Sequence, residues 1–79
     1  DVYKRQTWEM HPAGDEVVCL LSGEARLVLD HGDRHEEIAL DEPLAFAIVP
    51  RGTWHTAKTK TGCTILFITP GEGTENKDA

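Results

Sequence analysis

Three residues that can bind a metal ion lie close together near the start of the chain. Glu9 and His11 are two positions apart, so on an extended strand both side chains leave the same face. Residues 12–15 have the composition of a turn. Glu16 follows this turn and directly precedes the apolar run 17–21, which predicts a buried strand. Because this connection is so short, we expect Glu16 to return beside Glu9 and His11.

A fourth potential ligand, His55, lies far along the chain. It ends the run Pro-Arg-Gly-Thr-Trp-His, in which the proline and the glycine predict a tight turn directly before another strand. Imidazole and carboxylate groups are common ligands of divalent transition metals. The four side chains would form a site if the fold brought the two segments together.

The first segment resembles the first motif of the cupin family. That motif runs His-x-His, three or four residues, Glu, six residues, Gly, and here it reads as Glu9, His11, Glu16 and Gly23. The departure is Glu9, which stands in place of the first metal-binding histidine.

The second segment resembles the second cupin motif, which runs Gly, five residues, Pro-x-Gly, two residues, His, three residues, Asn. Pro50, Gly52 and His55 match it, whereas Leu44 stands in place of the leading glycine and Thr59 in place of the asparagine. The two motifs occur in order and cover roughly residues 7–69.

This resemblance implies an all-β cupin fold, a double-stranded β-helix or jelly-roll-like barrel that encloses a metal. The implied ligands are Glu9, His11, Glu16 and His55. Glu9 has a second possible role, in which its carboxylate orients His11 without touching the ion. Arg51 and Thr53, which flank the second motif, are predicted to contact a small-molecule ligand.

Periodicity in the chain independently predicts strands and no helix. About seven short apolar or alternating runs are separated by turn signals, a pattern typical of a sandwich or barrel. The predicted strands are 7–11, 16–22, 24–30, 34–40, 45–49, 55–59 and 63–69. The run 16–22 is nearly all apolar, which indicates burial on both faces. Residues 70–79 are rich in glycine and charge, and we expect a flexible tail there.

The first six residues, Asp-Val-Tyr-Lys-Arg-Gln, resemble the translation of a sequencing adapter left on metagenomic reading frames. We therefore expect residues 1–6 to be a non-native leader and one or more N-terminal strands to be missing. The alternative is a genuine charged arm.

Composition narrows the classes of partner. The chain has 14 acidic and 8 basic residues and a formal net charge of −6, which argues against nucleic acid and anionic membranes as partners. No apolar run is long enough to span a bilayer.

Cys19 and Cys63 lie in strand patterns and are predicted to be reduced thiols in a cytoplasmic protein, although a disulfide between them is an alternative. A short chain with open sheet edges leads us to expect a homodimer.

The predicted ligand set constrains the metal. A divalent ion bound by two histidines and two glutamates gives a formally neutral site, and the two carboxylates favour Fe(II) or Mn(II), with Zn(II) and Ni(II) as alternatives. His31 and His35 form no comparable set, because they lie in a polar hairpin that we expect to be solvated.

Three functions are consistent with the sequence. The first is a metal-dependent enzyme acting on a small polar molecule, the second a non-catalytic domain that binds or senses such a molecule, and the third a metal-free assembly module. No residue identifies a substrate, and there is no clear general base besides the predicted ligands.

Overall fold

The computed structural model describes residues 7–78, which form eight β-strands and no helix. The strands are β1 (Thr7–Met10), β2 (Glu16–Gly23), β3 (Ala25–Asp30), β4 (His35–Leu40), β5 (Phe46–Val49), β6 (Trp54–Lys58), β7 (Cys63–Ile68) and β8 (Glu75–Asp78). The seven predicted strands are all present, and their bounds differ from the prediction by one residue at most. Within the described residues, no helix is long and apolar enough to cross a membrane.

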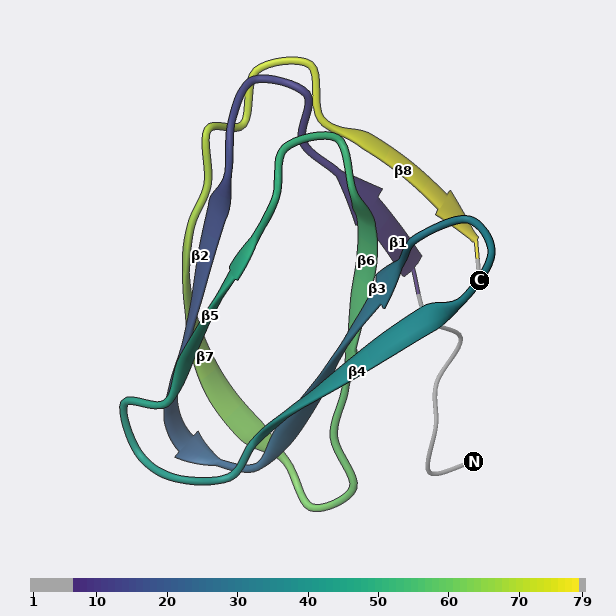
Figure 1. The fold of residues 1–79 in the computed structure, drawn as a ribbon. Helices are drawn as coiled ribbons and strands as arrows, with labels where there is room; N and C mark the ends of the chain where they lie inside the picture. Colours follow the sequence, from purple (N-terminus) through teal and green to yellow (C-terminus); the bar gives the residue numbers. More distant parts are fainter. Residues whose placement is uncertain (1–6, 79) are drawn as a thin grey trace.

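The strands form two antiparallel sheets that face each other (Figure 1). The larger sheet has the order β4-β3-β6-β1-β8 and the smaller one β5-β2-β7. The chain changes sheet at every connection except the hairpin between β3 and β4. As a result, the end of β1 and the starts of β2 and β6 lie at the same end of the two-layer structure.

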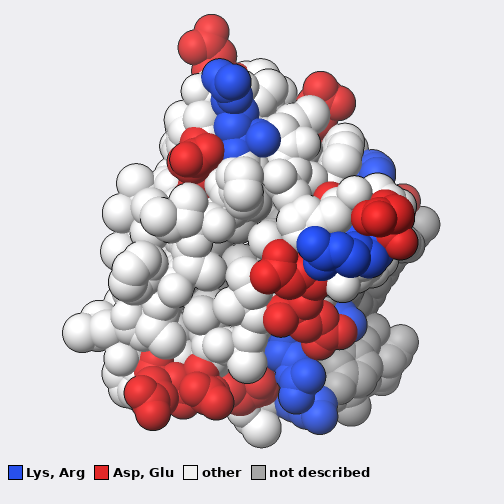
Figure 2. Space-filling model, viewed as in Figure 1, with Lys and Arg blue, Asp and Glu red and all other residues white. Residues whose placement is uncertain are grey.

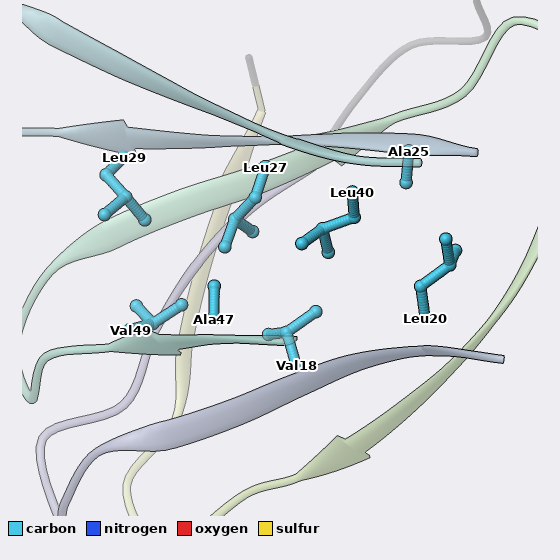
Figure 3. Close-up of a cluster of buried hydrophobic side chains, with 8 residues drawn as sticks. All are labelled: Val18, Leu20, Ala25, Leu27, Leu29, Leu40, Ala47 and Val49. Carbon is cyan, nitrogen blue, oxygen red and sulfur yellow. The ribbon is translucent and has the colours of Figure 1, made fainter. Parts of the chain in front are cut away.

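The hydrophobic core lies between the sheets (Figure 3). Alternate residues of β2 point inward, so Val18 and Leu20 are fully buried. Val18 is paired with Ala47 of β5, and side chains of β3 approach from the opposite sheet. The buried cluster consists of Val18, Leu20, Ala25, Leu27, Leu29, Leu40, Ala47 and Val49. Burial of this cluster is the main source of hydrophobic stabilisation in the described fold.

The outward face of β2 differs from its prediction. The apolar run 16–22 predicted burial on both faces, but Val17 and Cys19 are only half-buried and Leu21 is exposed. The prediction was wrong for this face because the described residues supply two layers, and the smaller sheet is covered on its inner side alone.

The end of the described chain also differs from the flexible tail predicted for residues 70–79. Residues Glu75–Asp78 form β8, which pairs with β1 at the edge of the larger sheet. All four residues are polar and exposed, so no apolar alternation marks this strand in the sequence. Ala79 lies outside the described residues.

Two further predictions concern the N-terminus and the cysteines. The predicted leader, residues 1–6, lies outside the described residues, and the missing strands stay a prediction. Cys19 and Cys63 are free thiols in the described structure, and both are half-buried.

Candidate metal centre

Four potential metal ligands converge at one end of the two-layer structure. Glu9 lies in β1 and His11 directly after it, while Glu16 is the first residue of β2 and His55 lies in β6. Glu9 and His55 are partners across β1 and β6, so their side chains share one face of the sheet. One ligand atom from each of the four residues lies within 4.8 Å of the others. The structure therefore brings together all four predicted ligands.

Hydrogen bonds between the loop that joins β1 to β2 and the turn before β6 make this convergence possible. The backbone N–H of Gly52 donates to the carbonyl of His11 at 3.0 Å, and the N–H of Arg51 donates to the Asp15 carboxylate at 2.8 Å. Gly52 has a φ of 77°, a conformation that favours glycine. The turn before β6 is thus held against the loop between β1 and β2, which brings His55 to Glu16.

Three buried atoms at the centre of the cluster have no hydrogen-bond partner among residues 7–78: Nε2 of His11, Oε1 of Glu16 and Nε2 of His55. The Nε2 atom of His11 is 3.1 Å from Oε2 of Glu16, and that of His55 is 3.0 Å from Oε1. Both are ion-pair distances, and none of the three atoms has a hydrogen-bond partner elsewhere among the described residues. Buried polar atoms without partners are costly, so this donor set fits a shared cation.

The tautomer of His11 is fixed by Thr74. The Thr74 hydroxyl donates to the carbonyl of Gly71 at 2.8 Å, and the same oxygen lies 2.9 Å from Nδ1 of His11. A hydroxyl has one proton to donate, so Nδ1 of His11 must be the donor in the second contact. The lone pair of the neutral imidazole is therefore on Nε2, the atom that faces the cluster.

His55 and Glu16 are oriented in a similar way. Nδ1 of His55 lies 3.0 Å from the backbone carbonyl of Thr53, which can only accept, so in the neutral imidazole the lone pair is again on Nε2. The hydroxyl of Thr69 donates to Oε2 of Glu16. Supporting contacts of this kind are typical of metal ligands. Sequence analysis missed Thr69 and Thr74. Thr69 is 53 positions from Glu16 and Thr74 is 63 positions from His11, so no local pattern indicates either contact.

The pKa values at the centre follow from burial and mutual contact. Burial raises the pKa of Glu16, but contacts with His55 and Thr69 and the nearby charges of both histidines outweigh it and lower the pKa below 4.5. Burial lowers the pKa of His55, but Glu16 and the Thr53 carbonyl, together with the charge of Glu9, raise it above 6.5. Without a metal, this pair therefore favours its ionised form.

Glu9 is the least enclosed member of the cluster. Its side chain is 48 % exposed, against 5 % for His11, and its Oε1 lies 3.7 Å from Nε2 of His11. It is close enough to the cluster to contribute a ligand atom and close enough to His11 to orient it. Both predicted roles are compatible with this position.

A cavity of about 210 Å³ adjoins the cluster. Its lining residues are Thr7, Glu9, Leu27, His55, Thr56, Ala57 and Phe67. Glu9 and His55 belong to both the cavity and the cluster, so a molecule in the cavity would reach a bound ion. Arg51 and Thr53 do not line it, and their predicted ligand contacts stay predictions.

The other histidines lie apart from the centre. Nε2 of His31 is 2.8 Å from the Glu36 carboxylate, and the ring of His35 lies 5.3 Å from that of Trp8. Among residues 7–78, neither belongs to a group of three or more potential ligands, in agreement with the predicted solvated hairpin.

A scan of the chain against protein-family models found no match, and searches of curated proteins and of solved structures found none either. The geometry of the cluster is therefore the basis for its interpretation.

Proposed function

We propose that this protein is a cupin that binds a divalent metal ion through His11, Glu16 and His55, with Glu9 as a fourth ligand. The observation that carries the proposal is the set of three buried atoms without hydrogen-bond partners within residues 7–78. One cation would give all three a partner, and two carboxylates would neutralise its charge. The ion would supply Lewis acidity and an anchoring point for a polar ligand.

Two backbone positions support the cupin assignment. Leu44, which stands where the second motif has its leading glycine, has a φ of 69°, in the left-handed region that favours glycine. Gly23, the last residue of the first motif, has a φ of 81°. A Cβ at Gly23 would clash with the carbonyl oxygen of Gly62. Both motif positions thus have backbone conformations suited to glycine, which agrees with the jelly-roll topology that we propose.

The donor set guides the choice of metal. Two carboxylates beside two imidazoles favour a harder ion, so Fe(II) or Mn(II) is preferred over Zn(II) or Ni(II). An octahedral ion with four protein ligands keeps two positions for a small molecule or water.

The cavity favours a small ligand with at most one negative charge. Its volume of about 210 Å³ is below the range of about 300–1,000 Å³ that is usual for drug-sized ligands. Leu27, Ala57 and Phe67 provide an apolar wall, and no lysine or arginine is among the lining residues to neutralise a second negative charge. We infer a molecule that places one polar group at the metal and a short apolar part on this wall.

Binding or sensing is the activity that this cavity supports best. Apart from the potential ligands Glu9 and His55, the lining residues include no side chain suited to general acid or base catalysis. A metal-dependent enzyme is the second candidate, supported by the two open positions on an octahedral ion.

Thermal unfolding with added Mn(II), Fe(II), Zn(II) or Ni(II) tests the proposal. We expect an ion at about 100 times its Kd to stabilise the native protein by about 2.7 kcal/mol. A double variant, His11→Ala with His55→Ala, is expected to show no such rise in Tm. A matched variant, His31→Ala with His35→Ala, retains it. Equal stabilisation of both double variants would place the bound ion elsewhere.

A further inference from the structure

The outward face of the smaller sheet is an exposed apolar surface built from all three of its strands. In the register of the sheet, Val17 is flanked by Ile48 and Ile68, and Cys19 by Phe46 and Leu66. Paired residues share one face of a sheet, so these side chains form two adjacent rows. We call this surface the apolar face; its residues are Val17, Cys19, Leu21, Phe46, Ile48, Leu66 and Ile68.

The large side chains of the apolar face are extensively exposed, and a contiguous apolar patch of this kind is often functional. Phe46, Ile48 and Ile68 are 64, 52 and 58 % exposed, although residues of these types are commonly buried. At roughly 200 Å² for a large side chain, the face exposes on the order of 500 Å² of apolar surface. The sequence reflects the same feature, because the apolar run of β2 has the composition of a strand buried on both sides.

Charge is absent from this surface. None of its seven residues is charged, although the whole chain has a formal charge of −6. Figure 2 shows that the side of the molecule formed by β2, β5 and β7 is white between charged groups above it and an acidic row below it. An acidic or basic partner would therefore find no opposite charge here, and the acidity of the chain opposes docking on anionic lipid.

We propose that the apolar face binds the same face of a second copy of this chain. Two equal apolar sheets can pack face to face about 10 Å apart, with strands aligned to within about 30°. A two-fold axis over β2, the middle strand, would place β5 and β7 of each copy over the partner's sheet and match apolar rows with apolar rows. Burial of about 500 Å² on each copy gives roughly 1,000 Å² in total, which reaches the lower limit for a specific interface.

The interface would act independently of the metal centre. Glu16 and His55 lie between the sheets, whereas the apolar face is on the outer side of the smaller sheet. It would give β2 the second covering layer that its sequence predicts, so that a small chain buries more apolar surface than it can alone.

Sedimentation equilibrium of the native chain over a range of concentrations tests this inference. We expect a reversible dimer of the 8.8 kDa chain. A double variant, Phe46→Lys with Ile48→Lys, is expected to be monomeric, whereas Ala39→Lys, at an exposed position on β4 of the other sheet, leaves the dimer intact. A second double variant, Phe46→Thr with Ile48→Thr, removes apolar area without adding charge. Threonine is common in β-strands, so this variant replaces the lysine variant in the experiment if the lysine variant does not fold. We expect it to weaken dimerisation at least tenfold.

Two results would overturn the inference. One is a native chain that stays monomeric at every concentration, which would leave the face to a different partner. The other is a dimer that the folded threonine variant does not weaken, which would place the interface on another surface.

Discussion

Thr74 and His11 are 63 positions apart, yet Oγ1 of Thr74 lies 2.9 Å from Nδ1 of His11. The contact is possible because β8, which starts after Thr74, pairs with β1, which ends before His11. The segment that follows β7 thereby orients a buried potential ligand of the metal centre. Metal binding and the docking of this segment are expected to support each other.

The first prediction concerns Thr74 as a positioning residue. Thr74→Val keeps the shape of the side chain but removes the acceptor for Nδ1 of His11. Loss of such a supporting contact typically weakens metal affinity by about 10–100-fold. Calorimetric titration with Mn(II) or Zn(II) measures it, and Thr64→Val, at an exposed site on β7, is the matched control. Unchanged affinity in folded Thr74→Val would contradict this role.

The second prediction separates Glu16 from Glu9. Glu16→Gln removes the buried charge that lies within 3.1 Å of both histidines, and we expect no measurable metal binding. Glu9→Gln changes a half-exposed group, and we expect affinity to fall about tenfold, or about 1.4 kcal/mol. Glu37→Gln, on the exposed part of β4, is the control. If Glu9→Gln bound metal like the native protein, Glu9 would have no part in holding the ion.

The third prediction concerns the loop between β6 and β7. The carboxylate of Glu24 accepts hydrogen bonds from the backbone N–H groups of Lys60 and Thr61, which lower its pKa below 4.5. Because its folded-state pKa is lowered, ionised Glu24 stabilises the fold above pH 4.5, and the contribution is lost as the pH falls through that lowered value.

Urea unfolding at neutral and at acidic pH measures this contribution. Glu24→Gln is expected to be less stable than the native protein at neutral pH, and the difference should shrink in acid. A difference that stayed constant with pH would show that the charge of Glu24 is not involved.

The fourth prediction compares two glycines with positive φ. Gly32 has a φ of 90°, and a Cβ added there would meet no atom of the described residues within 4 Å beyond its chain neighbours. Gly32→Ala is therefore expected to cost about 1–2 kcal/mol from backbone strain alone. In Gly23→Ala the new Cβ would meet the backbone of Gly62 and Cys63, which adds a further ~1–3 kcal/mol. Denaturant unfolding of both variants gives the two values. Equal losses would mean that β2 and β7 can separate freely at Gly23.

Local patterns predicted seven of the eight described strands and the four potential ligands. The spacing of Glu9, His11 and Glu16 was sufficient because all three lie on or beside two strands joined by a short loop. His55 followed from its turn and from the resemblance of its segment to a known motif.

The parts that the sequence did not predict depend on distant contacts. Thr69 and Thr74 reach the centre only because the segment after β7 returns to it, and β8 has no apolar residue to mark it. The apolar run of β2 predicts two covered faces. Its inner face packs against the core between the sheets, but the strand's own sequence does not identify what covers its outer face.

Metal content tests the central claim most directly. The native chain, purified without chelator or histidine tag, would be measured by plasma mass spectrometry beside the double variant His11→Ala, His55→Ala. We predict close to one divalent ion per native chain and none in the variant. A native protein that is metal-free and stays so after incubation with Fe(II), Mn(II), Zn(II) and Ni(II) would contradict the account.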